Sequence, residues 1–216
     1  MVEAEEENRK LLALLEAAPA APVLAQMHKH LTALTLYGIS GDMVALASAL
    51  QALTGLKELH LNTCYQSAVA ALAHPLPTLI HLEQLDIQNT RLNEEDVAAL
   101  APAFQALTSL RALTLHSNGL NAVGDAALAP LWHTGLHHLM FSSNNVGIEG
   151  VRSLVLAMTG MTLLTSLDLS NIGLYAEGAA TLAPILMLCK GIRKLDISGN
   201  HIGIEGVRSL PYDWGG

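Results

Sequence analysis

The pattern L-x-x-L-x-L recurs seven times and constrains the fold of this chain more than any other feature. The copies begin at Leu31, Leu56, Leu82, Leu110, Leu136, Leu164 and Ile192. The steps between them are 25, 26, 28, 26, 28 and 28 residues. Such a period is typical of a solenoid, in which each unit contributes a strand whose apolar side chains are buried only when neighbouring units stack. The 216 residues are therefore predicted to share one continuous core.

Segments with helical spacing follow several of these strands. Four of them share Asp or Glu near the start, followed by Ala and Leu: 41–50, 94–104, 124–132 and 176–186. Acidic residues favour a helix N-terminus, and small and aliphatic residues suit a tightly packed inner face. Pro102, Pro130 and Pro184 fall well inside three of these segments. Because proline removes a helical hydrogen bond and clashes with the preceding turn, we expect the helices to bend or break there.

The repeats divide the chain into three parts. Residues 1–30 are predicted to form a helical N-terminal cap, with one helix over 2–17 and a shorter one reaching about His30. A disordered acidic tail is the alternative for residues 1–8. Residues 31–210 are predicted to form the repeat domain, and residues 211–216 a short C-terminal tail. We expect either that the natural protein is longer or that this end exposes an edge.

Charge and cysteine content narrow the function classes. The formal net charge is −8, and the few basic residues are scattered, which argues against nucleic acid and anionic membranes as partners. Cys64 and Cys189 lie four repeats apart, roughly 19 Å at the usual strand spacing, so both are predicted to be free thiols. The acidic start lacks the pattern of a secretory signal, and no stretch approaches a membrane span. A cytoplasmic location is the expectation.

The repeated motifs are similar to those of a known family. The strand L-x-x-L-x-L-x-x-N, followed by N-x-I-G-x-E-G and an A-L-A helix, resembles the ribonuclease-inhibitor-like class of leucine-rich repeat proteins over residues 31–210. The resemblance implies an α/β leucine-rich repeat solenoid of about seven repeats. It would be a right-handed β-α superhelix shaped like a horseshoe, with a parallel sheet on its concave face and helices on its convex face. By itself it implies no chemistry.

The ninth motif position normally holds Asn or Cys, whose side chain satisfies backbone groups of the turn. Five repeats have these residues or a plausible substitute: Cys64, Thr90, Asn118, Asn144 and Asn200. Ile39 and Ile172 occupy the position in the first and sixth repeats, so we expect the buried polar ladder to be interrupted there. Cys64 is predicted to be structural rather than reactive, because reactive cysteines need exposure and positive neighbours.

Residues that alternate with the apolar positions should lie on the concave face. The candidates for partner binding are Tyr37, His60, Asp86, Gln88, His116, His138, Met140, Asp168, Lys194 and Asp196. His60 and Asp86 should be neighbours about 4.8 Å apart, close enough for an ion pair that raises the histidine pKa. Since no nucleophile stands beside them, we interpret them as a solvated pair rather than a catalytic dyad.

No metal or cofactor site is predicted. Asp168 and Asp196 should be adjacent and could bind a cation. Lys194 in the same strand as Asp196 is the simpler way to neutralise the charge of these carboxylates. Ten histidines invite a metal hypothesis, yet consecutive His137 and His138 should point in different directions. His28 and His30 likewise lie on divergent faces of a short helical segment. The sequence contains no CxxC, HExxH, GxSxG or phosphate-loop pattern.

These observations predict a non-enzymatic protein–protein interaction module, a scaffold that binds a macromolecular partner on its concave face. One alternative is a regulator of an enzyme in trans, such as a GTPase activator resembling the Ran-activating leucine-rich repeat proteins. Another is the recognition fragment of a larger effector or receptor. We also expect a symmetric homodimer through the C-terminal edge, with Tyr212 and Trp214 folding back over that edge as the alternative.

Overall fold

The computed structural model describes residues 31–38, 43–64, 71–121 and 135–211. The predicted N-terminal cap, the predicted helix 124–132 and residues 212–216 of the tail lie outside the described residues. Pro130, Ile39, His28 and His30, on which further predictions rest, lie outside them as well.

Each repeat contributes one strand to a single sheet. The strands are β1 (Ala33–Tyr37), β2 (Glu58–Asn62), β3 (Gln84–Gln88), β4 (Ala112–Thr114), β5 (His138–Met140), β6 (Ser166–Asp168) and β7 (Lys194–Asp196). They are parallel, and each pairs with the next in chain order. Equivalent motif positions stand opposite one another, as from Leu34 to Leu59 and from Leu59 to Leu85. The predicted parallel solenoid sheet is confirmed.

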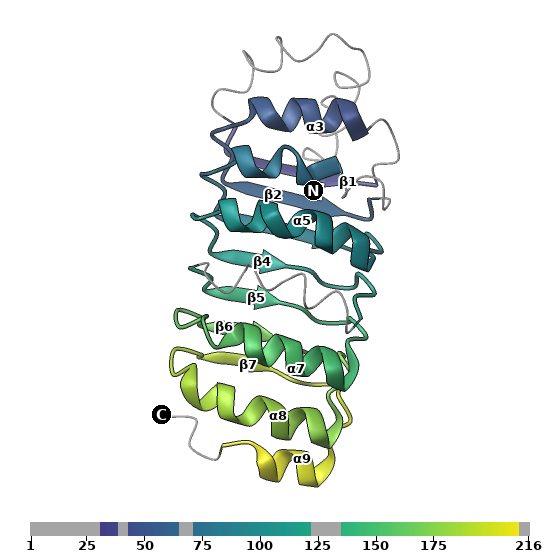
Figure 1. Cartoon of the computed structure of the whole chain (residues 1–216), viewed down its shortest axis with the longest axis vertical. Coiled ribbons are helices and arrows are strands. Elements are labelled where there is room, and N and C mark those ends of the chain that lie inside the picture. Colours follow the sequence, from purple (N-terminus) through teal and green to yellow (C-terminus); the bar gives the residue numbers. More distant parts are fainter. Residues whose placement is uncertain (1–30, 39–42, 65–70, 122–134, 212–216) are drawn as a thin grey trace.

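The connecting segments return along one side of the sheet (Figure 1). They contain α3 (Met43–Ala52), η1 (Ala71–Ala73), η2 (Leu76–Thr78), α5 (Glu94–Ala106), α7 (Gly147–Met158), α8 (Tyr175–Leu188) and α9 (Gly203–Ser209). The described part of the second connection forms only the two short 3₁₀ turns; Pro75 precedes η2 and Pro77 lies within it. Proline fixes the backbone and removes a donor, which disfavours a longer helix there. α5 begins at a capping box between Asn93 and Asp96.

The predicted breaks at Pro102 and Pro184 are wrong. α5 continues through Pro102, and α8 continues through Pro184. Both prolines lie on the exposed side of their helices, where water can satisfy the carbonyl that loses its partner. On the opposite side of α5, Ala103 and Phe104 are each only 1% exposed. Packing of that inner face outweighs the local cost of the proline.

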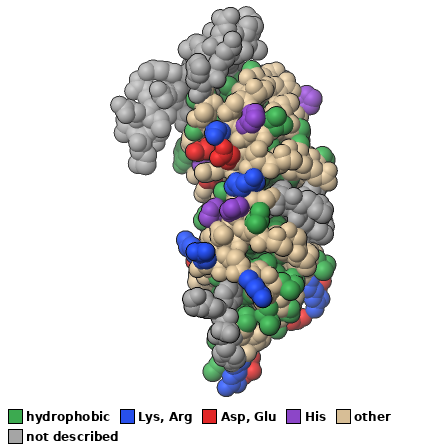
Figure 2. All heavy atoms as spheres, turned by 90° about the vertical axis from the view of Figure 1, so that its left-hand side faces the viewer, with side chains coloured by type: hydrophobic (Ala, Val, Ile, Leu, Met, Phe, Trp, Pro, Cys, Tyr) green, Lys and Arg blue, Asp and Glu red, His purple; other side chains and the backbone are tan. Residues whose placement is uncertain are grey.

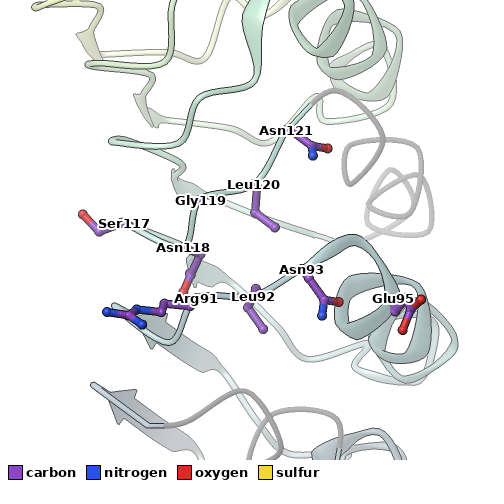
Figure 3. Close-up of a pocket in the computed structure, with 9 residues that line it drawn as sticks. All are labelled: Arg91, Leu92, Asn93, Glu95, Ser117, Asn118, Gly119, Leu120 and Asn121. Carbon is purple, nitrogen blue, oxygen red and sulfur yellow. The ribbon is translucent and has the colours of Figure 1, made fainter.

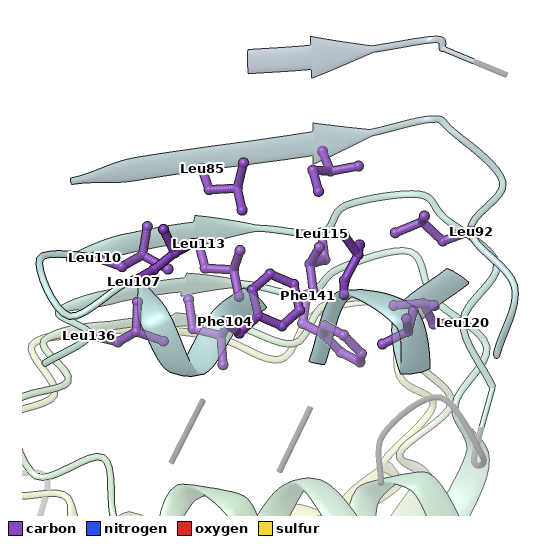
Figure 4. Packing of buried hydrophobic residues seen from close by; sticks show 14 of the residues in the cluster. Leu85, Leu92, Phe104, Leu107, Leu110, Leu113, Leu115, Leu120, Leu136 and Phe141 are labelled. Atoms are coloured by element: carbon purple, nitrogen blue, oxygen red, sulfur yellow. The ribbon is translucent and has the colours of Figure 1, made fainter. Parts of the chain in front are cut away.

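The core lies between the sheet and the helices. Leucines of the strand motif, such as Leu85 and Leu113, point toward Phe104 of α5 and Phe141 of the fifth repeat (Figure 4). Both phenylalanines are among the largest fully buried side chains in the described part of the chain. Aliphatic side chains and these two rings thus fill the core, to which each repeat contributes the same apolar motif positions.

Buried asparagines connect successive repeats. Asn144 accepts hydrogen bonds at Oδ1 from the N–H groups of Asn118 and Leu120, both at 3.1 Å. Its Nδ2 donates to the carbonyl oxygen of Leu115 at 2.8 Å. Asn118 and Asn200 make equivalent bonds to the repeats before them. The ladder is interrupted at Ile172 as predicted, because its buried side chain has no polar atom to offer Asn144.

Cys64 occupies the same motif position in the second repeat. Its side chain is 3% exposed, and its thiol donates to the carbonyl oxygen of Asn62 at 3.6 Å. The predicted burial of Cys64 is confirmed. Cys189 is buried too, and both cysteines are free thiols.

The residue just before the ninth motif position turns the chain away from the strand. It has a left-handed backbone in all seven repeats, with φ between 52° and 67°: Gly38, Thr63, Asn89, Ser117, Ser143, Asn171 and Gly199. Glycine and asparagine adopt this conformation readily, whereas a β-branched residue does so at a cost. Thr63 is therefore the least suited of the seven.

Candidate protein-interaction surface

The side of the sheet turned away from the helices forms one continuous surface, which we call the open face; it corresponds to the predicted concave face. Its middle row runs across all seven strands in register: Thr35, His60, Asp86, Thr114, Met140, Asp168 and Asp196. A parallel row contains Glu58, His138 and Lys194. Strand alternation places both rows on the face that the core does not use.

All ten predicted partner-binding residues lie on this face, and none of them is buried. Tyr37 and Met140 are its large exposed apolar side chains, 62% and 42% exposed. Gln88 ends β3, and His116 is the second residue after β4. The His116 ring is fixed on both sides, with Nδ1 2.9 Å from Oγ of Ser142 and Nε2 2.9 Å from Oγ of Ser117. The face therefore combines exposed apolar groups with positioned polar ones.

His60 and Asp86 form the predicted pair. Nδ1 of His60 lies 3.4 Å from Oδ2 of Asp86, and its Nε2 lies 3.7 Å from Oε2 of Glu58. The hydrogen bond to Asp86 raises the pKa of His60, against the opposing effect of burial. Gln88 donates to the same Oδ2 at 2.6 Å, whereas Oδ1 of Asp86 is buried without a hydrogen-bond partner. This carboxylate is thus incompletely satisfied within the described structure.

A second charged row, at the motif position just before the strands, was missed in the sequence analysis. Nζ of Lys57 donates to Oε1 of Glu83 at 2.8 Å. That hydrogen bond and the lysine charge lower the pKa of Glu83, with a smaller effect from Arg111 in the next repeat. The sequence does carry a signal for this row, because opposite charges occupy one motif position in successive repeats. In the side view of Figure 2, acidic, basic and histidine side chains lie close together in the upper half of the molecule.

Asp168 and Asp196 are partners in register, as predicted. Oδ1 of Asp168 accepts from the N–H and Oγ of Ser170, and Oδ1 of Asp196 accepts from the N–H of Ser198 at 2.9 Å. Hydrogen bonds from Ser198 lower the pKa of Asp196, and the charge of Lys194 adds a smaller effect. Within the described ranges, no three His, Cys, Asp or Glu side chains are grouped to hold a metal ion.

A hollow of about 600 Å³ lies between the loops that follow β3 and β4 (Figure 3). Its lining includes Arg91, Asn93, Glu95 and Asn121, with the buried Asn118 at the ladder. None of the ten predicted residues contributes to it. Residues 122–134, which follow Asn121 in the chain, lie outside the described part, and we assign no ligand to the hollow.

Residues 189–210 match the family model described as Leucine Rich repeat. This segment contains the seventh strand motif and the turn after it, and the six preceding strands repeat its register. The fold is a leucine-rich repeat solenoid. The match does not distinguish a subtype. Among curated proteins, none matches this chain.

Two solved structures show limited similarity to this leucine-rich repeat solenoid. An internalin from Listeria monocytogenes is 17% identical, with a TM-score of 0.28 and coverage of 94% of this chain and 92% of that one. A leucine-rich repeat protein from Leptospira interrogans is 14% identical, with a TM-score of 0.25 and coverage of 82% and 68%. Neither likeness is close enough to support a function. Of the helices that the structure describes, none has the length and apolar character required to span a bilayer.

Proposed function

We propose that this leucine-rich repeat solenoid, of the ribonuclease-inhibitor-like subtype, is a non-enzymatic interaction module that binds a protein partner through its open face. The observation that supports this is the shared placement of the ten residues: the sheet aligns them on one surface, and none contributes to the buried core. Solenoids of this kind use extended surfaces for binding. A cytoplasmic location is part of the proposal, supported by the free thiols of Cys64 and Cys189.

The middle of the open face suits a protein ligand. Met140 of β5 offers an exposed apolar contact, and on its β4 side lie His116, Asp86 and His60, polar groups held by the fold. Groups that are already positioned lose little conformational freedom on binding, so more of the contact energy contributes to affinity. A partner with an apolar side chain next to a row of hydrogen-bonding groups fits this arrangement.

The test replaces His60, Asp86, His116 and Met140 together with alanine. Affinity capture from the native organism, followed by calorimetry with the partner recovered, should show at least about tenfold weaker binding for this variant, as expected when central contacts are removed. A control variant changes Leu156, Glu177 and Met187, which are exposed on α7 and α8. Unchanged binding by the open-face variant, with loss in the control, would place the interaction on the helices and refute the proposal.

A further inference from the structure

One eight-residue segment occurs twice in this chain in different surroundings. G-I-E-G-V-R-S-L forms residues 147–154 at the start of α7 and residues 203–210 at α9. In the first copy Val151 is fully buried, whereas its equivalent Val207 is 52% exposed. Ile204 in the second copy is 67% exposed. Identical residues thus show which surface of α9 has no cover among the described residues.

The cover of the first copy is the next helix, α8. A side chain at Gly178 of α8 would approach Ile148 within 3.6 Å, which shows how closely the helices pass. Arg152 binds Glu149 in its own helix through Nη1 and Glu177 of α8 through Nη2, the latter at 2.8 Å. The covered copy therefore has both apolar and ionic contacts with a neighbouring helix.

The second copy keeps only the ion pair within its own helix. Arg208 binds Glu205 through Nη1 at 2.8 Å, but in the described chain its Nη2 has no acidic partner. Leu195, Ile197 and Leu210 are partly buried against the core at the same end. Apolar and ionic contacts are thus both incomplete on one end face, formed by β7 and α9.

Among the described residues, β7 pairs with β6 only, and no strand lies along its other edge. Lys194 donates its N–H to Thr165, and Asp196 accepts from the N–H of Leu169, so both direct their backbone groups toward β6. Successive residues of a strand direct these groups to opposite sides. The N–H and C=O of Leu195 therefore point to the free edge, where they can pair with a further strand.

We propose that a second copy of this chain covers the end face, with β7 of each copy antiparallel to β7 of the other and centred on Leu195. The two Leu195 residues would then exchange both backbone hydrogen bonds, as one residue pair in antiparallel ladders does. Lys194 would stand opposite Asp196 of the second copy on the open face, and the symmetry repeats this pair. The two α9 helices would cover each other's Ile204 and Val207.

Charge complementarity favours this occupant over a head-to-tail stack. If β7 joined β1 of another copy in the register of the sheet, Lys194 and Asp196 would face Ala33 and Thr35, which carry no charge. Only the antiparallel arrangement gives both charged residues of β7 an opposite charge. It also closes after two copies, whereas a head-to-tail stack continues.

A charge exchange tests the register in the full chain. Lys194→Glu and Asp196→Lys each turn both cross-strand pairs repulsive, and each should weaken dimerisation by about tenfold. Mixing the two variants restores opposite charges at both pairs, so the mixture should form heterodimers with wild-type affinity. Sedimentation equilibrium over a concentration series measures all three, and thermal melting confirms that each variant is folded. Ile204→Glu should also weaken the dimer, whereas Leu156→Glu, at a similarly exposed site on α7, should not.

Three outcomes would overturn the proposal. A monomer at every concentration would show that something else, such as residues 211–216, covers the end. Masses that grow beyond a dimer would indicate the head-to-tail stack. A dimer that is insensitive to both charge variants and to Ile204→Glu would place the contact elsewhere.

Discussion

The imidazole of His60 and the carboxylate of Asp86 face each other across β2 and β3, with Nδ1 3.4 Å from Oδ2. Glu58 and Gln88 are the other polar side chains in contact with this pair. The interaction stabilises protonated His60 and so links folding stability to pH. It also gives the open face a group that changes charge near neutral pH.

The first prediction concerns this pH dependence. The pKa of His60 is raised in the folded protein, so its contribution to stability is complete below the unfolded pKa, about 6.5, and is lost as pH rises through the folded pKa. The stability of the wild type relative to Asp86→Asn should therefore fall as the pH rises from about 6.5, the unfolded pKa, through the raised folded pKa of His60. NMR titration should show a lower His60 pKa in Asp86→Asn. Asp168→Asn, on the same face, should leave the His60 titration unchanged.

The second prediction concerns the asparagine ladder. Asn144→Ala removes an acceptor for two buried N–H groups and a donor to Leu115, and should lower the free energy of unfolding by about 3 kcal/mol. Urea denaturation measures the loss. Asn145→Ala, at the exposed adjacent residue, is the control and should change stability by less than about 0.5 kcal/mol. Equal effects of the two substitutions would contradict a structural role for the ladder.

The third prediction concerns the left-handed turn residue of the second repeat. Thr63 is exposed and β-branched at φ 56°, whereas Asn89 and Asn171 hold the same place in other repeats. Thr63→Asn should raise the free energy of unfolding by about 0.5–1 kcal/mol, because asparagine tolerates this conformation better. The same change at Thr114, inside β4, should bring no gain, since asparagine is disfavoured in strands. A loss of stability at Thr63 would refute the strain argument.

The fourth prediction concerns the two thiols. Cys64 and Cys189 are buried, and burial raises the pKa of the Cys189 thiol. A disulfide reagent at pH 8 should therefore react slowly with the native protein and should titrate two thiols per chain once it is denatured. Rapid native labelling of one thiol would show that its site opens easily, and Cys64→Ser would identify which one.

Much of the fold follows from period and side-chain type. The positions of Leu59, Asp86 and Asn144 in the repeat predict core, open face and ladder, because stacking places equivalent residues in one register. The helices through Pro102 and Pro184 could not be predicted, since buried neighbours on the opposite helix face decide the outcome. The pairing of Lys57 with Glu83 depends on a position outside the strands, where alternation makes no prediction.

The interruption of the asparagine ladder at Ile172 has a consequence for how this protein partially unfolds. Asn118 and Asn144 tie the third, fourth and fifth repeats together, and Asn200 ties the sixth to the seventh, but between the fifth and sixth the ladder side chain is apolar. Partial opening should therefore divide the chain between the fifth and sixth repeats, as a boundary between two cooperative units. Hydrogen exchange would detect this boundary as a step in amide protection, with repeats six and seven exchanging together.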